Sequence, residues 1–71
     1  METIERRFGH KVKQLRLSQK ISQEELAFRS GLSKNYISDV ERGTRNVSLR
    51  AIHKLAYGLQ VTENDLFMFN S

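Results

Sequence analysis

The residues between positions 34 and 42 include five polar side chains at helical spacing that could hydrogen-bond to the edges of nucleic-acid bases. At about 100° per residue, one side of such a helix would carry Lys34, Asn35, Ser38, Asp39 and Arg42. An amide can pair with adenine through two hydrogen bonds, an ammonium can donate to guanine, and a carboxylate can accept from the cytosine amino group. These side chains therefore favour a helix that enters the major groove of duplex DNA.

The other side of the same helix must hold it against the rest of the chain. It carries Ile37 and Val40, with Tyr36 at the boundary between the two sides. Tyr36 suits core packing, with its hydroxyl at the edge, as well as it suits base contact. Because a helix on any protein surface is polar outside, this stretch alone fits a plain solvated face equally well.

One pattern that predicts the start of a helix occurs several times along the chain. In it, a Ser or Thr directly follows an apolar residue, and a second apolar residue lies four positions after the Ser or Thr. The hydroxyl can accept a hydrogen bond from an unpaired amide of the first turn, and the apolar pair can clamp the chain there. Glu25 and Asp65 each follow such a hydroxyl by three residues, which predicts two capping boxes. The pattern occurs at Ser22, Ser33, Ser48 and Thr62.

A further helix, before residue 20, lacks this start signal. Its apolar face is formed by Ile4, Phe8, Val12 and Leu15, at spacings of four, four and three. Gly9 would destabilise this helix by roughly 1 kcal/mol relative to Ala. Left-handed glycines are expected after three of the helices, at Gly31, Gly43 and Gly58. The prediction is five helices, near residues 5–19, 23–30, 34–42, 49–57 and 63–68.

Length and composition limit the class of protein. The 71 residues suffice for one domain, residues 1–71, with a small core and marginal stability. Cys is absent, which excludes disulfides, thiolate metal sites and catalytic thiols. No apolar run reaches the roughly 20 residues of a membrane span, and no stretch resembles a signal peptide. We therefore expect a soluble cytoplasmic protein.

Charge is distributed unevenly along the chain. The formal net charge is +4 and the sequence pI is near 9.9, which points to a polyanionic partner. Residues 1–20 hold six Lys and Arg side chains, whereas residues 62–71 hold none. One end of the domain could thus face phosphates, while the other, acidic and apolar, suits contact with protein.

Small and apolar residues between positions 23 and 43 are spaced as in two crossed helices. Ala27 would let the helices approach closely, Gly31 would make the turn, and Ile37 would fill the angle between them. The full pattern resembles the helix-turn-helix of the lambdoid phage repressors and Cro, through Gln23, Ala27, Gly31, Ile37, Glu41, Arg42 and Gly43. This resemblance covers nearly the whole chain. It implies an all-α, five-helix domain that binds operator DNA as a two-fold dimer, without a cofactor or catalysis.

A closer resemblance, to the controller proteins of restriction-modification systems, lies in the run NYISDVERGTRNVSL at residues 35–49. It implies a division of roles among the polar residues. The base-reading residues would be Lys34, Asn35, Tyr36, Ser38 and Asp39. Contacts to the DNA backbone would come from Gln23, Ser33, Arg42, Arg45 and Asn46.

Several charged residues have a structural interpretation beside the functional one. Because phosphate repels a carboxylate, Asp39 would pair with cytosine, steer a neighbouring Arg or Lys, or lie plainly solvated. Arg16 and Glu41 occupy positions where this family often has a partly buried ion pair, and we expect that role for both. His10 and His53 have no Cys or carboxylate at ligand spacing, so no metal site is expected.

The tail at residues 66–69 consists of four apolar residues in a row, which cannot all face one small core. Part of it should be exposed in a monomer and covered in a dimer. In controller-type proteins the fifth helix makes this interface. The resemblance therefore implies a dimer interface in residues 62–71, with Leu66, Phe67 and Phe69.

The sequence thus predicts a homodimeric, sequence-specific DNA-binding transcriptional regulator that acts on a two-fold operator. A restriction-modification controller protein is the first interpretation, and a phage-type repressor or an antitoxin-like interaction module that autoregulates its operon is the alternative. The expected partners are double-stranded DNA and a second copy, with RNA polymerase as a further candidate. No membrane, small-molecule ligand or cofactor is expected, and the chain offers no nucleophile and base pair, phosphate loop or metal cluster of an enzyme.

Overall fold

Five α-helices make up the computed structural model, which describes residues 2–69. No strand occurs in that part of the chain. The all-α, five-helix prediction is therefore confirmed. The helices are α1 (Ile4–Ser18), α2 (Gln23–Ser30), α3 (Lys34–Arg42), α4 (Leu49–Leu59) and α5 (Glu63–Leu66).

Each helix begins after a Ser or Thr whose side-chain oxygen accepts a hydrogen bond from an amide of the first turn. The four predicted caps all form, with donor–acceptor distances of 3.0 to 3.1 Å. Although α1 lacks the apolar residue before its cap, Thr3 still accepts from the amide of Arg6 at 3.1 Å. Local sequence therefore sets the start of every helix.

Of the two predicted capping boxes, one forms. Thr62 and Asp65 exchange both hydrogen bonds, and the donation from the Thr62 amide lowers the pKa of the Asp65 carboxyl. At Ser22 only the first bond forms, because the Glu25 carboxylate pairs instead with Arg29, 2.8 Å away and one turn along α2. The capping-box prediction was therefore wrong for Glu25.

Two of the three glycines predicted to end helices do so. Gly31 and Gly43 follow α2 and α3 with φ of 72° and 74°. Gly58 lies inside α4, and the left-handed residue that ends this helix is Gln60, with φ of 58°. A Cβ at Gly58 would lie 2.9 Å from the Cβ of Ser30 on α2. Gly58 therefore permits the close packing of α2 on α4 and was wrongly predicted as a cap.

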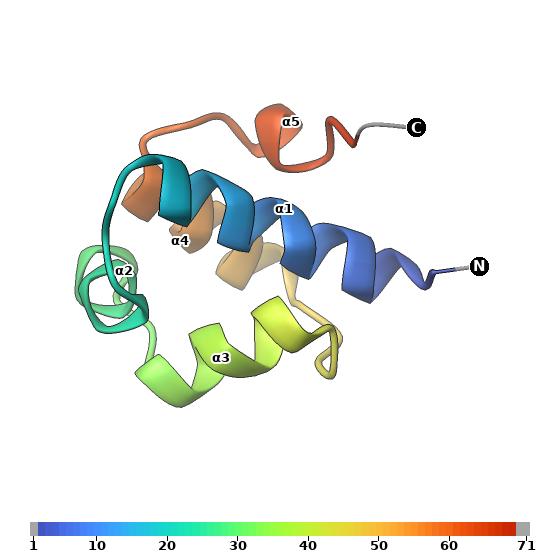
Figure 1. Ribbon diagram of the computed structural model, residues 1–71, viewed down its shortest axis with the longest axis horizontal. Coiled ribbons are helices and arrows are strands. Elements are labelled where there is room, and N and C mark those ends of the chain that lie inside the picture. Colours follow the sequence, from blue (N-terminus) through green and yellow to red (C-terminus); the bar gives the residue numbers. More distant parts are fainter. Residues whose placement is uncertain (1, 70–71) are drawn as a thin grey trace.

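The core draws on all five helices. In Figure 1, α1 crosses the middle of the view with α3 below it, α5 above it and α4 behind it. At the end of the molecule away from the start of α1 lies α2. Within residues 2–69, no helix has the length and apolar character that crossing a membrane requires. The core cluster consists of Phe8, Val12, Leu26, Ala27, Ile37, Val40, Leu55, Ala56, Leu59 and Leu66.

Gly9 lies where α1 crosses α3. A Cβ at this position would collide with the carbonyl oxygen of Val40, a backbone atom of α3. From the sequence, Gly9 is only an unfavourable residue within a helix. The structure shows that the close contact of α1 with α3 depends on it.

An exposed pair links α4 to α5. His53 Nδ1 lies 2.7 Å from Glu63 Oε2, and this hydrogen bond lowers the pKa of the Glu63 carboxyl. The sequence did not indicate this companion for His53, because ten positions separate the two residues. Residues 2–69 contain no group of three or more His, Asp or Glu side chains that could hold a metal ion.

Candidate nucleic-acid interface

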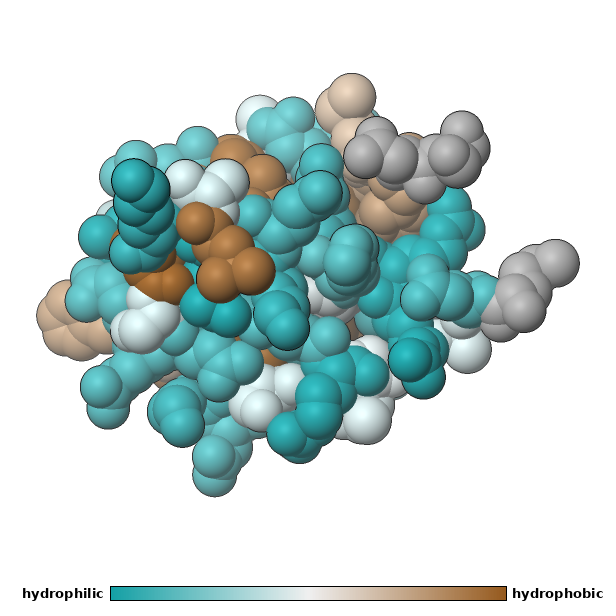
Figure 2. Space-filling view, viewed as in Figure 1, coloured by the Kyte–Doolittle hydropathy of each residue, from teal (hydrophilic) through white to brown (hydrophobic). Residues whose placement is uncertain are grey.

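The turn between α2 and α3 fixes the angle between these two helices. Ala27 is buried at the crossing of the two helices, and Gly31 makes the turn in the left-handed conformation. Ile37 and Val40 have exposed fractions of 0% and 1%, so the inner side of α3 is fully buried. The opposite side faces solvent, and Figure 2 shows hydrophilic side chains along the lower edge, where α3 lies.

The first turn of α3 offers hydrogen-bonding groups to the outside. Lys34 and Asn35 are exposed, as is the cap residue Ser33. The Ser33 hydroxyl oxygen accepts from the Tyr36 amide at 3.0 Å, which leaves its own proton for an outside acceptor such as a phosphate oxygen. The contacts of these residues to bases and DNA backbone stay predictions.

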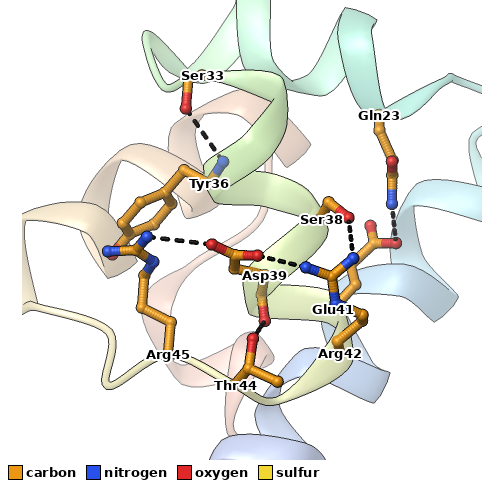
Figure 3. Close-up of polar contacts among 9 residues, drawn as sticks. All are labelled: Gln23, Ser33, Tyr36, Ser38, Asp39, Glu41, Arg42, Thr44 and Arg45. Atoms are coloured by element: carbon orange, nitrogen blue, oxygen red, sulfur yellow. Dashed lines mark hydrogen bonds and ion pairs between the residues drawn. The ribbon is translucent and has the colours of Figure 1, made fainter.

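Asp39 joins the helix to the loop that follows it. One carboxylate oxygen accepts from Arg42 Nη2 at 2.5 Å, and the other accepts from Arg45 Nη2 at 3.1 Å (Figure 3). Ser38 Oγ accepts from Arg42 Nη1 at 2.9 Å. Of the three interpretations open for Asp39, steering of neighbouring arginines is the one that the structure supports.

The loop after α3 is held against the helix at two further points. The guanidinium of Arg45 lies over the ring of Tyr36, 4.6 Å from its centroid, a cation–π contact. Thr44 donates to the Asp39 carbonyl oxygen from both its amide and its hydroxyl. Tyr36 also packs against the core. The structure thus shows the core role of Tyr36, and its contact with a base stays a prediction.

The predicted ion pair between Arg16 and Glu41 is confirmed. Arg16 donates to both Glu41 oxygens, at 2.7 and 3.2 Å, and to the Ile21 carbonyl oxygen at 2.9 Å. The exposed fractions of the two side chains are only 10% and 3%. Gln23, predicted to contact the DNA backbone, donates to Glu41 at 3.0 Å. Since an amide nitrogen has two protons, Gln23 keeps one for phosphate.

A basic side chain of α1 joins this surface, which the sequence did not reveal. Arg6 packs against Gly43, where an added Cβ would lie 2.5 Å from Arg6 Cγ. Arg6 shares a surface pocket with Arg42 and Thr44. The sequence showed that α1 is basic, but only the crossing of α1 over α3 selects which of its side chains lies beside the C-terminus of α3.

The end of the molecule where α1 begins exposes apolar side chains. The exposed fraction is 51% for Ile4, 43% for Phe67 and 85% for Leu49. Ile4 and Phe67 line one pocket together with Ile52, which lies one turn after Leu49 on α4. Asn46, predicted to contact the DNA backbone, is exposed at the rim of the same pocket. We call Ile4, Leu49 and Phe67 the apolar end.

The predicted dimer residues differ in their exposure. Leu66 is fully buried in the core of the protomer, so the prediction that it contacts a partner was wrong. Phe69 is half-buried beneath the guanidinium of Arg7, and Phe67 remains exposed. The sequence could not show which of these three residues is buried, because it predicted a helix to near residue 68, whereas α5 ends at Leu66. Residues 70 and 71 of the predicted interface lie outside the described residues.

Two helices joined by a turn at a glycine, with one side of the second helix buried and the other exposed to solvent, form the arrangement of a helix-turn-helix protein. The helix-turn-helix family model matches residues 12–66, and the chain belongs to this family. The phage-repressor type of domain and the resemblance to controller proteins are both confirmed by the comparisons that follow.

Among known proteins, the chain is similar to control protein C.BamHI of Bacillus amyloliquefaciens, with 54% identity over 65 residues, or 90% of this chain and 80% of that protein. It is 43% identical over 68 residues to control protein C.MunI of a Mycoplasma species, covering 94% of this chain and 92% of the relative. The crystal structure of the restriction-modification controller protein C.AhdI from Aeromonas hydrophila superposes with a TM-score of 0.87. That pair shares 48% identity over 89% of this chain and 96% of the other.

Proposed function

We propose that the protein is a sequence-specific DNA-binding transcriptional regulator of the restriction-modification controller type and is not an enzyme. The outer face of α3 is the observation that carries this proposal. The first turn of this helix exposes the Lys34 ammonium and the Asn35 amide, its last turn carries Arg42, and its other side is buried. A helix of this kind fits the major groove. The similarity to controller proteins over nearly the full chain supports the same function.

The test of this proposal is selection of binding sites from a duplex library with a random central segment. We expect enrichment of an inverted repeat whose half-sites are centred about 34 Å apart, because each α3 of a two-fold dimer would enter one major groove. Footprinting on the enriched duplex should protect both half-sites. Recovery of no preferred sequence at physiological salt would contradict the proposal.

Arg45 and Asn35 should affect binding in different ways. Arg45→Ala should weaken binding to every duplex and reduce the slope of log K against log salt by about 1, because one phosphate contact is lost. Asn35→Ala should relax discrimination at particular base pairs by roughly 1 to 3 kcal/mol, because an amide reads bases. The measurement is the dissociation constant on the selected duplex and on a scrambled duplex at several salt concentrations. Equal weakening on both duplexes by both variants would refute this division of roles.

We further propose that the apolar end makes the dimer interface. Leu49 is exposed in the first turn of α4, three residues before Ile52, which lines a pocket with Ile4 and Phe67. In a two-fold dimer both protomers present the same patch to each other, so a protruding side chain of one can fit the pocket of the other. Exposed apolar side chains that lie together also gain free energy when they are covered.

Leu49→Glu should convert the dimer to monomers, because it places a charge within the apolar contact. The fold should persist, because the Leu49 side chain is 85% exposed in the protomer. Phe28→Glu is the matched control, since Phe28 is also 85% exposed but lies on α2, at the other end of the molecule. Sedimentation velocity distinguishes the two outcomes. A dimeric Leu49→Glu variant, or a monomeric Phe28→Glu variant, would show that the interface lies elsewhere.

The remaining expected partners follow from this function. Contact with RNA polymerase is a prediction for a regulator that activates transcription. A cytoplasmic location is expected because bacterial operator DNA lies there. Neither prediction involves a cofactor or a small-molecule ligand.

A further inference from the structure

We propose that Asp39 is a positioning residue that determines DNA specificity: its carboxylate holds Arg42 and Arg45 in one arrangement that favours operator DNA over other DNA. The inference rests on the proposed DNA-binding function and deepens it. In this interpretation Asp39 touches no base itself and acts through the two arginines.

Within residues 2–69, Asp39 is the residue whose side chain accepts hydrogen bonds from both arginines. Its two carboxylate oxygens accept from different guanidinium groups, at 2.5 Å for Arg42 and 3.1 Å for Arg45. Arg42 belongs to the last turn of α3, whereas Arg45 belongs to the loop that follows. The carboxylate therefore fixes the loop's charge relative to the helix that would enter the groove (Figure 3).

The second contact of each arginine restricts it further. Arg45 is held between the Asp39 carboxylate and the ring of Tyr36, and Arg42 also donates to Ser38. With exposed fractions of 63% for Arg42 and 45% for Arg45, these long side chains would otherwise sample many rotamers. A guanidinium has five N–H donors, so donors remain on both arginines for phosphate or base.

The charges of Asp39, Arg42 and Arg45 explain why the Asp39 carboxylate should increase the specificity of DNA binding and not its affinity. Two guanidinium groups and one carboxylate leave a local charge of +1 where the arginines alone would give +2. Attraction to any duplex depends on the number of phosphates that a protein neutralises, so Asp39 weakens non-specific binding. On the operator, the two arginines lose little conformational entropy on binding, because Asp39 already orders them. This saving offsets the weaker attraction to phosphate.

Direct reading of cytosine fits this geometry less well. A carboxylate reads cytosine by accepting from its amino group. Both oxygens of Asp39 already accept from arginine, and the side chain is only 28% exposed. Each oxygen could still accept a second hydrogen bond, but a base would have to share it with a guanidinium at a side chain that is mostly covered.

The experiment compares Asp39→Asn with the wild-type protein on two duplexes, the one selected by the wild type and a scrambled one of equal length. We expect Asp39→Asn to bind scrambled DNA more tightly and the selected duplex no more tightly, so that the specificity ratio falls about tenfold. Glu63→Gln makes the same change of charge on α5, away from α3, and should keep the ratio. Circular dichroism melting checks that each variant folds.

A second arm repeats the comparison in an Arg45→Ala background. There, Asp39→Asn should change the ratio by less than it does in the wild-type background, because only Arg42 remains for it to position. An unchanged ratio for Asp39→Asn alone, or its full effect in the Arg45→Ala background, would overturn the proposal. So would a loss of discrimination confined to one base pair, since that identifies a cytosine reader.

The outcomes separate this proposal from the function on which it rests. If the wild type enriches no sequence, the proposed function fails, and the role of Asp39 fails with it. If the wild type enriches an operator and the ratio does not depend on Asp39, only the role of Asp39 fails.

Discussion

Replacing Glu41 with alanine should lower the free energy of unfolding by about 3 to 5 kcal/mol, a large part of the total for a domain of this size. The Glu41 carboxylate accepts two hydrogen bonds from Arg16 and one from Gln23, and its side chain is 3% exposed. Without it, the Arg16 guanidinium stays buried with a single backbone acceptor, the Ile21 carbonyl oxygen. Urea unfolding followed by circular dichroism, at one fixed protein concentration, measures the loss.

Two controls identify burial of an unpaired charge as the cause. The double replacement Arg16→Met with Glu41→Leu should recover most of the stability, because no charge then remains buried. Glu25→Ala removes an acid from a pair with a similar distance, 2.8 Å, to Arg29, but both side chains are over 40% exposed. That change should cost less than about 1 kcal/mol. If the double variant were no more stable than Glu41→Ala, the explanation would be wrong.

Gly9→Ala should destabilise the domain by about 3 kcal/mol, although the same change inside an ordinary helix stabilises it by up to about 1 kcal/mol. The added methyl group would collide with the Val40 carbonyl oxygen. Because this obstacle is backbone, no rotamer change can relieve it, and α1 and α3 must separate. The separation displaces the helix that carries the proposed base-reading residues, so binding to the selected duplex should weaken as well.

The sign of the effect makes this prediction easy to test. Lys13→Ala, at an exposed position on the same helix, should change the free energy of unfolding by no more than about 0.5 kcal/mol. Thermal melting of both variants at equal protein concentration gives the comparison. A Gly9→Ala protein that melts at or above the wild-type temperature would show that α1 and α3 do not need this glycine.

Much of the fold could be predicted from the sequence, because the signals that start helices are local. Ser22, Ser33, Ser48 and Thr62 bond to amides only three residues away. Helix ends were predicted less well. Gly58 has the residue type of a cap, yet it lies inside α4, since packing against Ser30 requires a residue without a side chain there.

The candidate interface was predicted in part. The amphipathic pattern of residues 34–42 identified the outer face correctly, because a helix has a fixed angle per residue. The same pattern could not show that Asp39 binds arginines, since one of them, Arg45, lies beyond the end of the helix and reaches back to it. The buried position of Leu66 also followed from the packing of α5 and not from its apolar neighbours.

The sequence by itself determined the starts of α2 to α5, the turn at Gly31 and the family to which the chain belongs, because caps, turns and helical periodicity act over a few residues. Only the tertiary structure decided the need for Gly9, the burial of Leu66 and the partners of Asp39. These features depend on where helices cross and how the loops return, and such contacts join residues that no local pattern relates.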